Sequence, residues 1–337
     1  MRITDIGEFG LIDRIDRALG PPGAGVVVGI GDDVAVLRGG GQNYLLATCD
    51  IQVEGIHFLK EAITPYQLGR KAVAINLSDI ASMGGWPTYI LVSLALPKET
   101  EVEYVDGLYE GLREESEAAG AEIVGGNLSH SERGVMVDIF LLGEVEPDHL
   151  LLRSGARVGD RILVTGQVGD SGAGLALLLN PSLSVKEEER EVVLRAHFTP
   201  TPRLKEGRAI AASGMATAMI DISDGLASDL GHICERSGMG ALIKAKELPL
   251  SPAAKAIAGL LDKAPLDFAL HGGEDYQLLF TVRPEKAEEL AKIVREETGT
   301  PVSIIGQIRP PQEGMRLALA NGEIVPLMPK GWDHFRR

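Results

Sequence analysis

Short apolar runs, bounded by glycine and proline, alternate along the chain with longer stretches of helical periodicity. The short runs predict buried strands, and the longer stretches predict helices. Because strands and helices alternate throughout, the sequence predicts a mixed α/β (α+β) fold. The strands expected in the first half span 26–30, 44–47, 89–96 and 135–145. Those expected in the second half span 161–165, 217–222, 277–282 and 302–308.

Two helices of the first half have clear ends. One begins after Thr64, because a threonine cap followed by Pro65 is typical of a helix start, and it ends before Gly84. The other spans 102–119 and ends at Gly120. In the second half, helices are expected near 172–179, 203–213, 225–237 and 284–298.

The length of 337 residues exceeds what one hydrophobic core usually supports, so two domains are expected. A long strand gives way near 147–159 to a segment rich in glycine and arginine. A boundary there divides the chain into a domain of residues 1–148 and a domain of residues 149–337.

The net charge of −15 constrains the partners of this chain. An acidic chain without a basic stripe is not expected to bind nucleic acid, and it repels a polyphosphate unless cations stand between the two. No apolar run approaches the roughly 20 residues that span a bilayer, and the acidic N-terminus is unlike a signal peptide. The two cysteines, Cys49 and Cys234, fit a reducing compartment, so we expect a cytoplasmic protein without a membrane partner.

The standard phosphate-binding sequences are missing from the chain. There is no Gly-Lys dipeptide and therefore no Walker A loop, and Gly23-Ala24-Gly25 lacks the third glycine of a dinucleotide fingerprint. The His-Arg-Asp loop of protein kinases is also missing. A nucleotide would therefore have to bind by another route.

Aspartates at the ends of apolar strands suggest that route. Asp33 follows the first strand and Asp50 follows the second, and carboxylates in such places suit Mg²⁺, which shares its other positions with water and phosphate. The Gly-Asp-Asp sequence that ends at Asp33 is equally typical of an ordinary turn. Asp79, in the helix after Pro65, shares a face with Asn76 and is either a metal ligand or a solvent-facing carboxylate.

The strongest local pattern of the second half lies at 218–226. An apolar strand carries Asp221, and Asp224 follows after a turn that leads into a helix. Asp224 could simply cap that helix. Asp221 needs a partner or a metal if its strand is buried, which favours a functional interpretation.

Other candidates are weaker when taken singly. Glycine-rich junctions at 125–127, 165–172 and 272–276 could approach phosphates with backbone amides. Arg153 is either a phosphate clamp or an ordinary surface residue beside the domain boundary. His57 and Trp332 could contact an organic substrate or serve only in packing.

Taken together and in order, these motifs resemble those of the thiamine-monophosphate kinases, a family of the superfamily named after aminoimidazole ribonucleotide synthetase. The resemblance extends from end to end of the chain. Its motifs lie at 7–9, 29–33, 53–58, 76–84, 169–171, 200–203, 221–225, 272–276 and 331–335.

This resemblance implies a two-domain aminoimidazole ribonucleotide synthetase-like fold, with a sheet-rich N-terminal domain that binds ATP and metal and an α/β C-terminal domain. It implies transfer of the γ-phosphoryl group of ATP to thiamine monophosphate, giving thiamine diphosphate and ADP. Because the attacking phosphate oxygen is already largely ionised at pH 7, no general base is expected. It also implies several Mg²⁺ ions and a homodimer formed through the N-terminal sheets. Whether a monovalent cation such as K⁺ is needed as well stays open.

Carried over position by position, the resemblance assigns three sets of residues. The metal-binding set is Asp33, Thr48, Cys49, Asp50, Asp79, Asn127, Asp221 and Asp224. The ATP-binding set is Tyr109, Gly126, Asn127, Arg153 and Ser223. The set that binds thiamine monophosphate is His57, Glu274 and Trp332.

Two positions depart from the family pattern. Asn127 stands where aspartate is common, which removes one charge and would loosen that metal site. Cys49 stands where a hydroxyl residue is common, and because a thiol is a poor Mg²⁺ ligand, Cys49 is expected to contribute only its backbone.

Two alternatives stay open. One is another ATP-using enzyme of the same superfamily, although the reactive N-terminal cysteine of selenophosphate synthetase and the C-terminal cysteine of hydrogenase maturation factor E are both missing. The other is a nucleotide-binding sensor without catalysis, which the departures at Asn127 and Cys49 make plausible.

Overall fold

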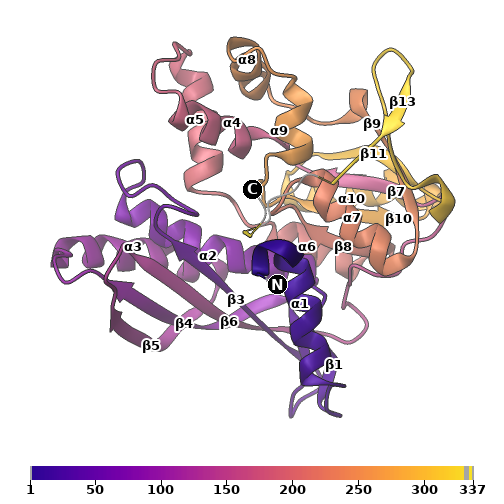
Figure 1. Ribbon diagram of the computed structural model, residues 1–337. Helices are drawn as coiled ribbons and strands as arrows, with labels where there is room; N and C mark the ends of the chain where they lie inside the picture. The colour runs from indigo at the N-terminus through magenta and orange to yellow at the C-terminus, as the bar shows by residue number, and fades with distance from the viewer. Residues whose placement is uncertain (1, 330–333, 336–337) are drawn as a thin grey trace.

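Residues 2–329 and 334–335 are described by the computed structural model, in which two β-sheets with their helices stand next to each other (Figure 1). The predicted mixed α/β fold is confirmed. Across the described residues, no helix is both long enough and apolar enough to cross a membrane.

The first sheet has the strand order β1-β2-β3-β6-β4-β5. Its strands are β1 (Val26–Val28), β2 (Ala35–Arg38), β3 (Tyr44–Val53), β4 (Trp86–Leu96), β5 (Glu122–His130) and β6 (Met136–Val145). Neighbouring strands are antiparallel except β4 and β5, which run parallel.

The two faces of this sheet differ because side chains alternate between them along each strand. On the inner face, the buried residues Ile90, Val92 and Ile139 pack in one core with apolar residues of α2 (Pro65–Ser82). The outer face is the opposite one, and its exposed apolar residues are Ile51, Tyr89, Leu91 and Phe140. An outer face of this kind is typical of a surface that another protein covers.

Helix α2 packs closely against α3 (Val102–Ala119). The side chain of Thr64 accepts a hydrogen bond from the backbone N–H of Gln67, so the predicted cap is confirmed. A Cβ at Gly69 would stand 2.2 Å from the carbonyl oxygen of Leu108, and one at Gly111 would stand 2.0 Å from that of Tyr66. Glycine is therefore required at both positions for the two backbones to touch, which sets the close packing of α2 against α3.

The second sheet has the strand order β13-β12-β9-β11-β7-β10-β8. Its strands are β7 (Arg161–Thr165), β8 (Ala216–Asp221), β9 (Gly240–Lys244), β10 (Leu278–Val282), β11 (Val302–Arg309), β12 (Met315–Ala318) and β13 (Ile324–Pro326).

Helices cover both faces of the second sheet. One core contains α6 (Leu204–Ala212) and α10 (Ala287–Thr298), and another contains α7 (Leu226–Ser237) and α9 (Pro265–His271). The further helices α4 (Asp170–Leu179), α5 (Glu187–Phe198) and α8 (Pro252–Leu260) form a separate apolar cluster together with Phe268 of α9.

Two sequence expectations are corrected by the strand boundaries. Asp50 lies inside β3, which continues to Val53, rather than at the end of a strand. The segment 125–127 is not a junction, because it lies inside β5. Both errors arise because polar residues and glycines that belong to an exposed or functional strand interrupt the apolar run that predicts a strand.

Several elements were not expected from the sequence. They are α1 (Ile3–Leu19), β2, β5, α5, β9, α8, α9, β12 and β13. Helix α1 is mostly exposed, and its backbone departs from helical geometry at Gly7, where φ is 71°. An exposed helix lacks the strong apolar stripe on which a sequence prediction depends.

The two halves meet along α2 and α6. Arg208 of α6 donates hydrogen bonds to both carboxylate oxygens of Glu146 (2.8 and 2.9 Å) and to the carbonyl oxygen of Gly84 (2.6 Å). His334, near the C-terminus, lies beside the first half, and its backbone N–H donates a hydrogen bond to the carboxylate of Glu8 in α1. The junction between the halves places the end of β8 beside α2.

Candidate functional site

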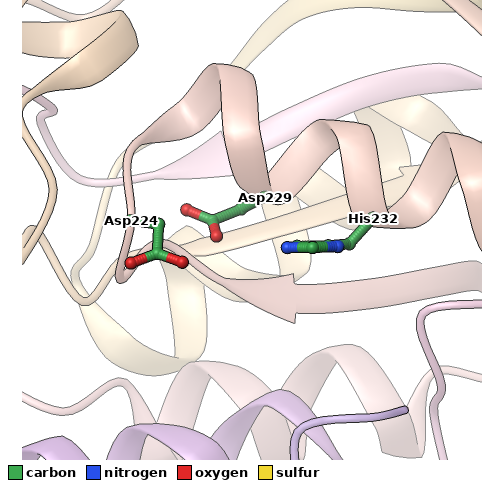
Figure 2. A group of neighbouring side chains, drawn as sticks. All are labelled: Asp224, Asp229 and His232. Carbon is green, nitrogen blue, oxygen red and sulfur yellow. The ribbon is translucent and has the colours of Figure 1, made fainter. Parts of the chain in front are cut away.

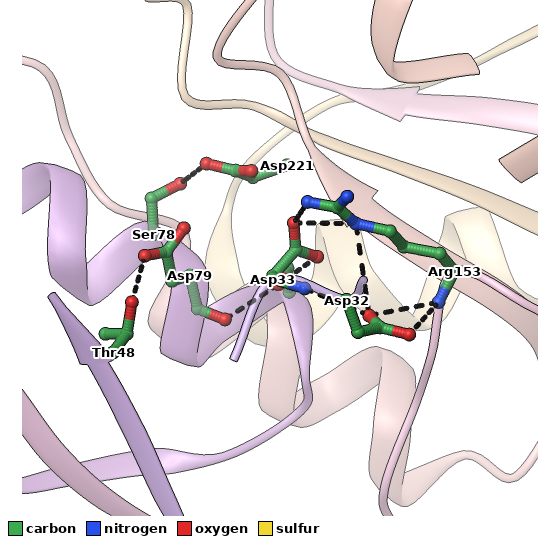
Figure 3. A network of polar contacts seen from close by, with 8 residues as sticks. Asp32, Asp33, Thr48, Ser78, Asp79, Arg153 and Asp221 are labelled. Atoms are coloured by element: carbon green, nitrogen blue, oxygen red, sulfur yellow. Dashed lines mark hydrogen bonds and ion pairs between the residues drawn. The ribbon is translucent and has the colours of Figure 1, made fainter. Parts of the chain in front are cut away.

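Three carboxylates converge where α2 meets the end of β8 (Figure 3). Asp33 follows β1, Asp79 lies in the last turns of α2, and Asp221 is the final residue of β8. One oxygen atom from each lies within 4.8 Å of the other two. The fold therefore brings together three aspartates that stand far apart in the sequence and that were singled out there as candidate metal ligands.

A hydroxyl group orients each of these carboxylates (Figure 3). Thr48 of β3 donates to Asp79 at 2.6 Å, and Ser78 of α2 donates to Asp221 at 2.6 Å. Ser82, one turn after Ser78, donates to Asp33 at 2.8 Å. The two serines were missed in the sequence, although two hydroxyls spaced by four residues in a buried helix are a recognisable signal.

The electrostatics of this cluster favour a cation. Burial raises the pKa of Asp221 to about 8, and repulsion from Asp33 adds to the shift. Burial also raises the pKa of Asp79 well above its ordinary value, with repulsion from Asp50 and Asp221 adding to it. Buried carboxylates of this kind ionise readily only beside positive charge. A divalent cation with oxygen ligands fits this donor set.

Asp50 stands at the edge of the cluster. Its side chain reaches solvent, but the protein atoms packed around the carboxylate raise its pKa to about 6, and Asp138 and Asp33 add to the shift. This environment disfavours the ionised form of the Asp50 carboxylate. A cation bound between Asp50 and Asp79 would therefore stabilise the ionised form of both carboxylates.

Arg153 contacts the cluster from the segment between the two sheets (Figure 3). Its guanidinium group forms an ion pair with Asp33, and its backbone N–H donates to Asp32 at 3.3 Å. The side chain is only 19% exposed, so the alternative of an ordinary surface residue is wrong. An arginine held by a carboxylate would have to exchange that partner before it could contact a phosphate.

Glu274 lies in a second polar cluster beside the first. Its carboxylate forms an ion pair with Lys71 at 2.7 Å. The Nδ1 atom of His197 lies 3.3 Å away, but burial lowers the pKa of His197 to about 4, so this contact is to a neutral ring near pH 7. Burial opposes ionisation of Glu274, but Lys71 and His197 outweigh it and lower the pKa. The φ angle of 55° at Glu274 and a 2.7 Å hydrogen bond from its N–H to Ser223 hold the loop against the end of β8.

Lys71 was missed in the sequence. It is 1% exposed and lies in α2 between the apolar residues Leu68 and Ile75. A lysine on the buried face of a helix needs a buried partner of opposite charge. Its place among apolar residues of the helix was the signal in the sequence that could have identified Lys71.

His57 faces the same region from the loop after β3. Its Nδ1 atom accepts a 3.0 Å hydrogen bond from the N–H of Val53, and its ring lies 5.0 Å from the ring of His334. Burial lowers the pKa of His57. Trp332, the third residue of the predicted substrate set, lies outside the described residues.

The remaining members of the predicted sets lie apart from the three carboxylates. Cys49 alternates with the inward-facing Thr48, so its side chain projects to the outer face of the first sheet, opposite Phe140. Asn127 lies on β5 opposite Ser93, three strand spacings or roughly 14 Å from β3. This distance separates Asn127 from the carboxylate cluster within one chain.

Gly126 and Tyr109 belong to the same edge of the first half. A Cβ at Gly126 would stand 1.8 Å from the carbonyl oxygen of Val92, so no larger residue fits there. Tyr109 of α3 lines a cavity of about 710 Å³ whose wall also includes Arg113 and Ile123.

Asp224 precedes α7, whose N-cap position is occupied by Gly225, so the interpretation of Asp224 as a simple helix cap is wrong. Asp229 and His232 of α7 lie beside it (Figure 2). Neither was singled out in the sequence.

Family models match both halves of the chain. Residues 31–145 match the AIR synthase related protein N-terminal domain, and residues 157–316 match the corresponding C-terminal domain. These matches and the two-sheet architecture define the class: the chain belongs to the AIR synthase related proteins.

Similar proteins place the chain more narrowly within this class. A thiamine-monophosphate kinase of Aquifex aeolicus is 39% identical, covering 99% of this chain and 100% of the relative. One of Salmonella typhimurium is 37% identical, covering 98% of both. The chain therefore belongs to the thiamine-monophosphate kinase family, as its motifs predicted.

Solved structures agree with this placement. The structure described as AaThiL complexed with AMPPCP and TMP superimposes with a TM-score of 0.86, is 37% identical and covers 99% of both chains. A thiamine-monophosphate kinase from Stenotrophomonas maltophilia has a TM-score of 0.76 at 32% identity, over 94% of this chain and 97% of its own. The hydrogenase maturation protein HypE, in complex with ATP, is similar at 18% identity, which shows a shared fold alone.

Proposed function

We propose that this chain transfers the γ-phosphoryl group of ATP to the phosphate of thiamine monophosphate, giving thiamine diphosphate and ADP. The observation that carries the proposal is the convergence of Asp33, Asp79 and Asp221 within 4.8 Å, in a chain whose full-length relatives are thiamine-monophosphate kinases. A related protein of the same fold binds AMPPCP and TMP together.

Several Mg²⁺ ions would be held around the carboxylate cluster. Asp33, Asp79 and Asp221 supply its centre, and burial disfavours their charge without a cation. Thr48, Cys49 through its backbone, Asp50 and Asp224 are assigned as further ligands. Asn127 is assigned to metal binding as well, although it lies apart from this cluster within one chain. The ions, when bound, offset repulsion between two polyanions, which is roughly 4 kcal/mol per pair of unit charges at 4 Å with an effective dielectric near 20.

The acceptor would lie beside Glu274. His57, Glu274 and Trp332 are assigned to thiamine monophosphate. Lys71 keeps the Glu274 carboxylate ionised, so that this carboxylate can accept a hydrogen bond from the cationic organic part of the substrate or form an ion pair with it. Because Lys71 and His197 fix this carboxylate from two sides, it is oriented before substrate arrives.

ATP would approach from the first half. Tyr109, Gly126, Asn127, Arg153 and Ser223 are assigned to it, and the cavity beside Tyr109 offers room for the base.

No general base is required for this reaction. The attacking group is a phosphate oxygen, which is largely ionised at neutral pH because its second pKa is about 6. The residues of the chain therefore act by binding the two phosphates in line and by excluding water, which is how most phosphoryl transfer is accelerated.

We further propose that the chain divides into residues 1–148, which bind ATP and metal and dimerise, and residues 149–337. The exposed apolar outer face of the first sheet, with Ile51, Tyr89, Leu91 and Phe140, favours a homodimer formed through it. Such a dimer would cover Cys49 and Asn127, which lie on that face. Two unpaired cysteines fit a cytoplasmic location.

The proposal is tested by incubating the purified protein with ATP, MgCl₂ and thiamine monophosphate and measuring thiamine diphosphate and ADP by chromatography. We expect both products in equal amounts, and none when Mg²⁺ is chelated. Tight ATP binding without thiamine diphosphate would reject the kinase and favour the nucleotide sensor. ADP formation that ignores thiamine monophosphate would favour another ATP-using enzyme of the superfamily.

A further inference from the structure

Asp229 is a buried carboxylate with an unused oxygen. The residue is 1% exposed, and its Oδ2 atom has no hydrogen-bond partner among the residues that the structure describes. Leaving such an oxygen unpaired in the protein interior is unfavourable. A buried carboxylate with an unpaired oxygen therefore indicates that a ligand binds this oxygen.

The carboxylate of Asp229 lies beside two other potential ligands, Asp224 and His232 (Figure 2). Asp229 and His232 lie three residues apart on one face of α7, and Asp224 stands in the turn before that helix. One ligand atom from each lies within 4.8 Å of the other two. Ligands held at roughly 2.1 Å around one cation are roughly 3.0–4.2 Å apart, so small side-chain adjustments would complete the set.

We propose that Asp224, Asp229 and His232 form a divalent-cation site that prefers Mn²⁺, Co²⁺ or Zn²⁺ to Mg²⁺. The preference follows from the imidazole nitrogen, which suits these metals, whereas the cluster of Asp33, Asp79 and Asp221 offers carboxylate oxygens alone. Asp224 is also assigned to Mg²⁺ under the proposed function, but Asp229 and His232 are not, and the site exists whether or not the chain transfers phosphate.

The position of this site gives it a structural consequence. A bound cation would tie the turn that carries Ser223 and Asp224 to the first turns of α7. The ring of His232 packs 4.9 Å from that of Phe9, so the same cation would also order the contact with α1. The site therefore couples the N-terminal helix to the loop at the end of β8.

The test uses electron-spin-echo spectroscopy of Mn²⁺ bound to the full chain, without ATP or thiamine monophosphate and with excess Mg²⁺ present to occupy the oxygen-only sites. We expect ¹⁴N modulation from a directly bound imidazole at substoichiometric Mn²⁺. His232→Gln removes it, and His149→Gln, at a histidine paired with Glu146 in another region, retains it. Absence of the modulation in the unmodified chain, or its survival in His232→Gln, overturns the proposal.

A second variant covers the case in which His232→Gln does not fold. Asp229→Asn keeps the shape of the side chain and removes the charge, so we expect at least about 10-fold weaker Mn²⁺ binding at this site by titration calorimetry in excess Mg²⁺. Unchanged affinity contradicts the assignment of Asp229. Because neither measurement uses substrate, failure here is distinguishable from failure of the kinase activity.

Discussion

Ser78 of α2 donates a 2.6 Å hydrogen bond to Asp221 at the end of β8, across 143 residues of sequence. The bond joins the helix that covers the first sheet to an edge strand of the second. It orients one oxygen of Asp221 and leaves the carboxylate beside Asp33 and Asp79. The cluster therefore depends on how the two halves dock.

The metal-free protein is expected to lose stability as the pH rises from about 4 to about 8. Asp221 has a pKa of about 8 in the folded chain, against about 3.9 when unfolded, so the folded state holds the proton more tightly and its advantage disappears over that range. Mg²⁺ binds the ionised form, so the stabilisation by Mg²⁺ should grow over the same range. Melting temperatures measured with EDTA and with Mg²⁺ between pH 5 and 8 check this. A rise in melting temperature on adding Mg²⁺ that becomes smaller at higher pH contradicts the prediction.

Asp50→Ala and Asp221→Ala are each expected to lower the rate of thiamine diphosphate formation by about 100-fold or more. Loss of a ligand that stabilises charge in the transition state removes several kcal/mol, and each 1.4 kcal/mol is about tenfold in rate. Steady-state kinetics measure the effect, with circular dichroism to verify folding. The matched control is Asp13→Ala on exposed α1, which should retain full activity. Normal turnover in either test variant rejects the assigned roles.

Lys71→Met is expected to destabilise the protein by about 3–5 kcal/mol, because it leaves the carboxylate of Glu274 without its cationic partner. Urea denaturation measures this loss. The double variant Lys71→Met/Glu274→Gln should recover much of the stability, since it removes the stranded charge as well. Lys286→Met breaks an exposed ion pair with Glu289 and should cost less than about 1 kcal/mol. Equal effects of the two lysine variants would show that the buried pair has no special role.

Leu91→Glu is expected to convert a homodimer into a monomer without loss of the fold. The side chain lies on the exposed apolar outer face of the first sheet, where a charge would be desolvated against a second copy. Light scattering coupled to size exclusion measures the mass. Leu260→Glu, at another exposed leucine, on α8, is the control and should leave the mass unchanged. A monomeric unmodified chain, or a dimer that survives Leu91→Glu, contradicts the predicted interface.

Much of the local structure followed from local chemistry. The cap at Thr64 and the glycine at 120 predicted the start of α2 and the end of α3, because capping depends on a few neighbouring residues. Strand β5 was missed because it is an exposed edge strand that contains two glycines, so it lacks a buried apolar run. The assignment to the kinase family rested on the order of many short motifs, and the full-length relatives agree with it.

The sequence by itself determined the alternation of strands and helices, the family, and the suspicion that Asp33, Asp79 and Asp221 act together. Only the tertiary structure decided that Lys71 holds Glu274 and that Cys49 projects away from Thr48. It alone showed that Asp229, beside His232, has an oxygen without a partner among the described residues. The physical reason is that residue type and local spacing set the propensity of a segment. Burial, the face to which a side chain points and the charge beside it depend on how segments that lie apart in the sequence pack together.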